Sequence, residues 1–175
     1  NRFREMAFLN KGVKIIFTDE REDFTETFHY EGGIKSFVEY MNRNKNSLHS
    51  EVIYFQGQRG DSQVEISMQY TDGYSENVLT FANNIHTPEG GSHLVGFRTA
   101  LTRTLNDYGR KYNLIKDKDA NLQGDDTREG LTGIVSIKLP NPQFEGQTKA
   151  KLGNSESRGI VETFLYDNLM TFLEE

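Results

Sequence analysis

Alternating apolar and polar positions predict several strands along the chain. Val64, Ile66, Met68 and Tyr70 alternate with polar residues, which is typical of a strand with one buried face. Similar short patterns predict strands over residues 14–18, 26–30, 52–56, 76–83 and 131–139. The charged turn at 19–23 joins the first two as a hairpin, and the Asp72-Gly73 pair predicts a tight turn between 64–70 and 76–83. We therefore expect the strands 52–56, 64–70 and 76–83 to form a three-stranded meander.

Three other segments have the periodicity of helices. Apolar residues recur at steps of three and four residues within 34–41, 94–108 and 160–173. The first helix ends near residues 42–46, and Asn154 or Ser155 is the expected N-cap of the last. The middle helix packs on the sheet, with Arg103 and Arg110 on its far side. Strands grouped before and between helices predict an α+β, two-layer fold, with residues 113–124 as a polar surface loop.

The length of 175 residues suits a single domain, which we place over residues 1–175. The chain starts with Asn1 and stops within an apolar-periodic segment, so we expect it to be a fragment of a longer subunit. It has no cysteine, which excludes disulfides and thiolate metal sites and fits a cytoplasmic protein. No apolar run is long enough to span a membrane. The net charge of −6 indicates that any DNA contact is local.

The candidate chemistry centres on Gly146-Gln147-Thr148-Lys149. The lysine ammonium suits a terminal phosphate, the Gln147 amide can donate to a phosphoryl oxygen or orient a water, and Gly146 leaves the backbone free to turn. Such a short string is weak alone. A second candidate, 86–93, holds two histidines and Glu89, but their order matches no known ligand spacing, so we predict no metal site. His93 is instead expected to cap or pack at the start of the helix.

Together with Gly124-Asp125-Asp126-Thr127-Arg128-Glu129-Gly130 and residues 93–106, this loop makes the chain resemble the transducer domain of the B subunits of bacterial DNA gyrases. The resemblance covers nearly the full chain and implies the left-handed βαβ fold of ribosomal protein S5 domain 2, found as the second domain of GHKL-type ATPases. That handedness opposes the usual crossover rule, so propensity alone does not predict it.

The resemblance also implies roles for particular residues. Gln147 and Lys149 would contact the γ-phosphate of ATP held in the preceding GHKL ATPase domain, with Lys149 as the catalytic residue. Arg98 would contact double-stranded DNA in a central cavity, or else pack at the core edge with its head in solvent. Arg128-Glu129 would be a fixed element beside the loop with an internal ion pair, and Lys151 a solvated flank.

The implied function is ATP-dependent negative supercoiling by a heterotetramer with the gyrase A subunit. ATP and Mg²⁺ would act in the intact subunit, and none is expected on this fragment alone. Two alternatives stay open, namely the equivalent domain of topoisomerase IV and a non-catalytic DNA-cavity scaffold module.

Overall fold

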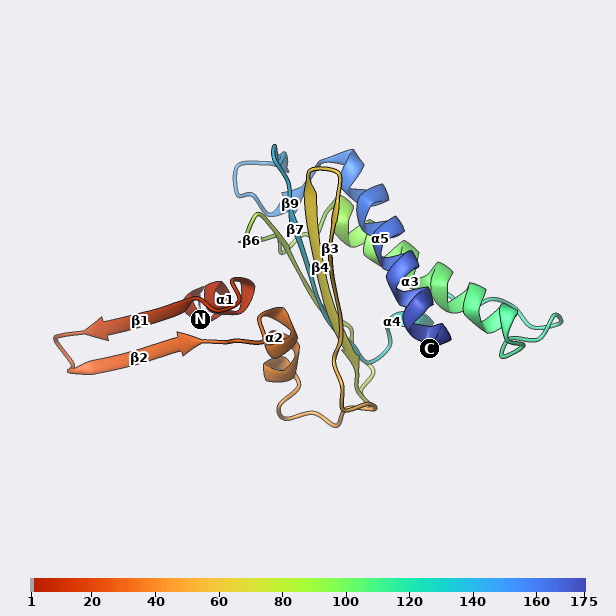
Figure 1. Cartoon of the computed structure of the whole chain (residues 1–175), viewed down its shortest axis with the longest axis horizontal. Helices are drawn as coiled ribbons and strands as arrows, with labels where there is room; N and C mark the ends of the chain where they lie inside the picture. The colour runs from red at the N-terminus through yellow and green to blue at the C-terminus, as the bar shows by residue number, and fades with distance from the viewer. Residues whose placement is uncertain (1) are drawn as a thin grey trace.

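A five-stranded mixed sheet forms the centre of the protein (Figure 1). The computed structural model describes residues 2–175. The strands lie in the order β3, β4, β7, β5, β6. β3 and β4 are antiparallel, as are β4 and β7, whereas β5 pairs with β7 in parallel. The bounds are β3 Ile53–Arg59, β4 Ser62–Tyr70, β5 Asn77–Ala82, β6 Ile85–His86 and β7 Leu131–Lys138.

The predicted three-stranded meander is wrong, although each of its strands exists. β4 does not pair with β5, because β7 lies between them. Seven of the eight residues of β7 are buried, and only a strand covered on both faces and both edges can bury nearly every residue. The chain still turns at Asp72-Gly73, but it passes the start of β7, where the Thr71 amide donates to the Gly130 carbonyl, before β5 begins.

Two long helices cover one face of the sheet. α3 (Ser92–Lys111) and α5 (Ser155–Glu174) pack along each other, and their apolar stripes form the larger core with β4 and β7. Both predicted helices are confirmed. At Gly96 the two helices approach so closely that a Cβ would overlap the Arg158 carbonyl oxygen, so only glycine fits there.

The opposite face is also partly covered, which differs from the two-layer prediction. α1 (Arg2–Leu9) and α2 (Ile34–Met41) form a smaller core there that includes Phe8, Phe37 and Ile134. Ser67 and Gln69, which the alternation of β4 places outward, are 0% and 4% exposed. The Ser67 hydroxyl donates to the Ile34 carbonyl at 2.9 Å, so the polar residues of β4 hold α2 on the sheet.

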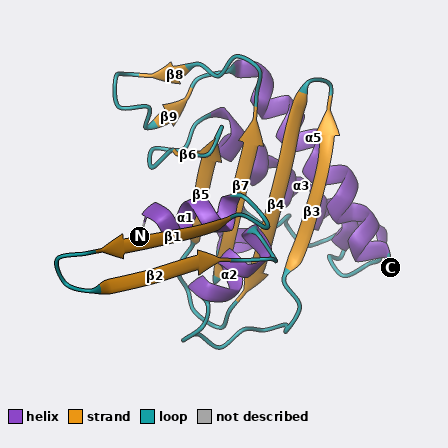
Figure 2. Ribbon diagram, turned by 60° about the vertical axis from the view of Figure 1, so that its left-hand side comes forward, coloured by secondary structure: helices purple, strands orange, loops and turns teal. Residues whose placement is uncertain are grey.

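The predicted first hairpin is confirmed as β1 (Lys14–Asp19) and β2 (Phe24–His29). Among residues 2–175 its strands pair only with each other, and it extends away from the five-stranded sheet (Figure 2). Large apolar side chains on it are exposed, including Ile16 at 59%. Three short elements complete the fold, namely α4 (Gly124–Arg128), β8 (Phe144–Glu145) and β9 (Lys151–Leu152).

Candidate functional site

The Gln147–Lys149 segment lies at the tip of a loop between β8 and β9. Phe144 pairs with Leu152, and Glu145 pairs with Lys151, which leaves residues 146–150 as the tip. Gln147, Thr148 and Lys149 are exposed. Within residues 2–175, the side chains of Gln147 and Lys149 have neither a hydrogen bond nor an ion pair. Both groups are therefore available to an external ligand.

The backbone of this tip is left-handed at two positions. Gly146 has φ 78° and Lys149 has φ 56°. Glycine adopts this conformation freely, whereas a side chain with a Cβ costs about 1 kcal/mol there. Lys149 thus has a backbone conformation that lysine disfavours. Such conformations cluster at active sites and ligand-binding sites.

The base of the loop is fixed to the segment that precedes α3. The Leu152 amide donates to the Gly90 carbonyl at 3.0 Å, and the Glu89 amide donates to the Ala150 carbonyl at 2.9 Å. Gly91 allows this approach, because a Cβ on it would overlap the Leu152 backbone. The loop therefore has a rigid base and an unattached tip.

The other lysine of the loop, Lys151, is exposed as predicted, and it also has an anionic partner. The Lys151 ammonium lies 3.3 Å from the Glu145 carboxylate, across the β8–β9 pair. This ion pair is half-exposed and worth less than about 1 kcal/mol. Since Lys151 has an anionic partner, Lys149 is the lysine of this loop whose charge is uncompensated.

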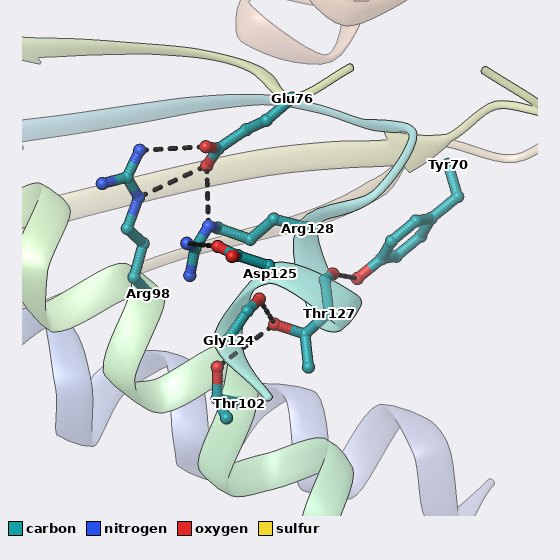
Figure 3. A network of polar contacts seen from close by, with 8 residues as sticks. All are labelled: Tyr70, Glu76, Arg98, Thr102, Gly124, Asp125, Thr127 and Arg128. Carbon is teal, nitrogen blue, oxygen red and sulfur yellow. Dashed lines mark hydrogen bonds and ion pairs between the residues drawn. The ribbon is translucent and has the colours of Figure 1, made fainter. Parts of the chain in front are cut away.

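Arg98 belongs to a separate cluster of charges at the start of β5 (Figure 3). Its Nε and NH2 groups donate to the Glu76 carboxylate at 3.3 and 2.9 Å. Arg128 shares this carboxylate at 3.3 Å and also reaches Asp125 at 2.9 Å. The Arg98 side chain is 41% exposed and that of Arg128 is 18% exposed. Arg98 is thus a partly exposed cation held in place by Glu76.

α4 is held beside this cluster by Thr127, which is buried. The Thr127 hydroxyl donates to the Gly124 carbonyl, and its own carbonyl accepts from the Tyr70 hydroxyl at 2.7 Å (Figure 3). Burial raises the pKa of Tyr70 to about 12, so the phenol stays protonated and can donate. These contacts fix the position of Arg128.

The internal ion pair predicted for Arg128 is confirmed, but its predicted place beside the loop is wrong. Arg128 precedes the first residue of β7, whereas the loop follows the last. An eight-residue strand spans about 25 Å. The structure therefore does not bring Lys149 together with Arg98 or Arg128, and the chain carries two separate candidate sites.

The arginines on the far side of α3 make structural contacts. Arg103 lies 3.9 Å from Asp107 and stacks over the Tyr166 ring. Arg110 donates to Asn121 and to the carbonyls of Lys116 and Asp119, which holds the polar loop after α3. Arg103 therefore forms an ion pair on this face, and Arg110 organises a loop.

The two histidines considered for a metal site lie in different surroundings. His93 is 0% exposed, packs at the start of α3 as predicted, and has its Nε2 3.1 Å from the Thr87 hydroxyl. Burial lowers the pKa of His93 to about 4, so it is neutral at pH 7. His86 packs against the Phe81 ring. The described part of the chain has no group of three His, Cys, Asp or Glu residues placed to hold a metal.

Sequence reasoning missed the role of two residues that organise these sites. Glu76 joins Arg98 to Arg128, and no sequence spacing indicates this because it depends on β5 lying next to β7. Asn154 occupies the predicted N-cap position, but its side chain bonds the loop stem at Asn141 and Gln143 instead. Asn141, which accepts one of these bonds, lies between two prolines that indicate only a turn.

None of the helices formed by residues 2–175 is long and apolar enough to cross a membrane.

Comparisons of the sequence with known proteins all indicate the same family. Residues 33–175 match the family model described as DNA gyrase B. The DNA gyrase B protein of Clostridium acetobutylicum is 60% identical over 175 residues, covering 99% of this chain and 28% of that protein. The gyrase B protein of Bacillus mycoides is 57% identical, covering 99% of this chain and 43% of that protein.

Solved structures agree. The 43K ATPase domain of Thermus thermophilus gyrase B, in complex with an aminocoumarin, matches with a TM-score of 0.89 and 40% identity, covering 99% of this chain and 46% of that one. The topoisomerase IV ATP-binding domain of Francisella tularensis matches with a TM-score of 0.82 and 26% identity, covering 99% and 46%. The chain spans less than half the length of these relatives. On the family model and these identities, the chain belongs to the DNA gyrase B family.

Proposed function

We propose that this chain is the transducer domain of a DNA gyrase B protein. It would couple ATP binding and hydrolysis in a neighbouring GHKL domain to DNA strand passage and negative supercoiling. The observation that carries the proposal is the loop tip at Gln147 and Lys149, which is exposed, uncompensated in charge and mounted on a fixed base. One solved structure similar to this chain is a gyrase B ATPase domain, so ATP is the ligand that we propose for the tip.

The chemistry of the tip fits the γ-phosphate of ATP. The Lys149 ammonium would stabilise charge on the phosphoryl group during transfer, and the Gln147 amide would donate to a phosphoryl oxygen. Adenine, Mg²⁺ and the attacking water would be held by the preceding domain, so the isolated chain is not expected to bind ATP. When hydrolysis removes the γ-phosphate the contact ends, which frees the loop and the helices attached to its base.

Two surfaces support the proposed partners. The exposed apolar residues of the β1–β2 hairpin, such as Ile16 and Phe24, suit a buried contact with the preceding domain. The partly exposed Arg98 suits a phosphate of double-stranded DNA in a central cavity, with Glu76 orienting it. The gyrase A subunit would complete the cytoplasmic heterotetramer.

We also propose that the parallel β5–α3–β7 connection has the left-handed crossover of the ribosomal protein S5 domain 2 fold.

The alternative is the equivalent domain of topoisomerase IV, because a topoisomerase IV structure also shares the fold. The 60% and 57% identities to the gyrase B proteins of Clostridium acetobutylicum and Bacillus mycoides favour gyrase. A non-catalytic scaffold module is the other alternative, and in that case Lys149 would not affect ATP turnover.

The test is Lys149→Ala in the intact subunit, with Lys151→Ala as the matched control. Both changes remove one exposed lysine from the same loop, but Lys151 is paired with Glu145. We expect Lys149→Ala to lower ATP turnover about 100-fold with nucleotide binding nearly unchanged, because the lost contact is made to the transferring group. Lys151→Ala should change turnover less than about twofold. Equal rates for Lys149→Ala and the wild type would refute the proposal.

A further inference from the structure

The Asn154 side chain bonds to the stem that precedes the tip of the loop carrying Lys149. Its Oδ1 accepts from the Gln143 amide at 2.5 Å, and its Nδ2 donates to the Asn141 carbonyl at 3.0 Å. Nδ2 also lies 2.8 Å from the Glu156 carboxylate. The residue is 3% exposed. A buried amide whose donor and acceptor are both satisfied fixes the groups around it, because breaking either bond leaves a buried polar group unpaired.

The position of Asn154 makes this use of its side chain unusual. It is the N-cap residue of α5. Asparagine is favoured at this position because its oxygen accepts from an amide of the first helical turn. Within the described residues its side chain makes no such bond. Two of its three side-chain hydrogen bonds go to the loop stem at Asn141 and Gln143 instead, and the third goes to the Glu156 side chain.

The tip of the loop depends on its stems for its position. Gln147 and Lys149 have no side-chain hydrogen bond or ion pair among the described residues. One stem is bonded to the Glu89–Gly90 segment before α3, through Ala150 and Leu152. The other stem, at Asn141 and Gln143, is bonded to the start of α5 through Asn154. Hydrogen bonds thus connect the loop to the starts of both long helices. The bonds to α5 are made by the Asn154 side chain.

We propose that Asn154 is a positioning residue for Lys149, which places the ammonium for the γ-phosphate and makes the loop and the start of α5 move together. This inference rests on the proposed function of Lys149. A displacement of about 1 Å in a positioned group can lower a rate by about 100-fold. Because the Gly153 amide still donates to the Gln143 carbonyl at 2.7 Å, losing Asn154 displaces the loop without releasing it. We therefore expect a smaller loss, of about tenfold.

The experiment measures ATP turnover and KM of the intact subunit for Asn154→Ala and Asn154→Asp, each with Lys149 present and with Lys149→Ala. The aspartate keeps the acceptor for the Gln143 amide and the preference for the N-cap, but it cannot donate to the Asn141 carbonyl. It also places a negative charge beside Glu156. Asn168→Ala is the control, because Asn168 lies on the same helix and donates to the Phe164 carbonyl, away from the loop.

With Lys149 present, both Asn154 variants should lower turnover about tenfold with KM for ATP nearly unchanged. In the Lys149→Ala background they should lower it less than about twofold, because the group that they position is gone. Asn168→Ala should have no effect on turnover in either background. If Asn154→Ala does not fold, the turnover of Asn154→Asp in the two backgrounds is sufficient to test the inference.

Three results would overturn the inference. Falls of equal size in both backgrounds would mean that Asn154 acts on stability, independently of Lys149. Normal turnover in both Asn154 variants, with a large loss in Lys149→Ala, would remove the positioning role while leaving the proposed function intact. Normal turnover in Lys149→Ala itself would instead refute the proposed function, and this inference with it.

Discussion

Replacing His93 should remove a pH dependence of stability that arises from its burial. The imidazole is 0% exposed at the start of α3, and its Nδ1 has no hydrogen-bond partner among the described residues. Burial disfavours the charged form and lowers the pKa from 6.5 to about 4. His93 also lies two residues after Gly91, where the base of the loop contacts α3. Its protonation should therefore weaken the attachment of the loop.

The sign and size follow from proton linkage. Between pH 6.5 and about 4 the unfolded chain binds a proton at this residue and the folded chain does not. The contribution of His93 is therefore fully present above about pH 6.5, falls as the pH is lowered, and reaches its lowest value near pH 4. A pKa difference of this size corresponds to about 3 kcal/mol, which is a large part of the 5–15 kcal/mol typical of a domain.

The assay is urea unfolding of the wild type and of His93→Leu at several pH values from 7 to 4. Leucine is apolar and does not titrate, while the carboxylates contribute equally to both proteins. The difference in free energy of unfolding should shift by about 3 kcal/mol in favour of the variant as the pH falls. A difference that stays constant from pH 7 to 4 would refute the reasoning.

Two further predictions concern the backbone of the loop base and the arginine cluster. Gly91→Ala should lower the free energy of unfolding by more than about 2 kcal/mol, because the added Cβ would overlap the Leu152 backbone. Gly146→Ala, also at positive φ but in open space, should lower it by only about 1 kcal/mol. Equal losses for the two variants in denaturant unfolding would contradict this. Arg98→Gln in the intact subunit should reduce DNA stimulation of ATP turnover and lower the salt slope of DNA binding by about one, with little change in melting temperature because its pair with Glu76 is partly exposed. Arg43→Gln, near α2, is the control, and intact DNA stimulation with a lower melting temperature would show that Arg98 is structural.

Local patterns were sufficient to predict the longer strands, the first hairpin and three of the helices, but not α1, α4, the short strands or which strands lie side by side. The helices at 34–41 and around 94–108 follow from apolar spacing, and the hairpin at 14–29 follows from its charged turn. The place of β7 between β4 and β5 depends on which strand is buried on both faces, which is a property of the assembled sheet. The available signal was that residues 131–139 hold five apolar residues and only one charged one, Lys138.

The site shows the same division. The exposure of Gln147 and Lys149 agrees with the loop prediction, because glycine-containing polar segments are usually exposed turns. The pairing of Arg98 with Glu76 joins residues 22 positions apart, one on α3 and one just before β5. Local periodicity carries no information about such contacts. The bonds of Asn154 were missed for a related reason, since an N-cap asparagine has a local partner by default.

The central claim is that the loop tip contacts a nucleotide only while the γ-phosphate is present. Amide hydrogen exchange of residues 146–150 in the intact subunit tests this most directly, measured without nucleotide, with ADP, and with a non-hydrolysable ATP analogue. Residues 146–149 of this range are exposed, so they should exchange rapidly without nucleotide. The account predicts that the analogue slows their exchange and that ADP does not. Equal exchange with ADP and with the analogue would contradict it.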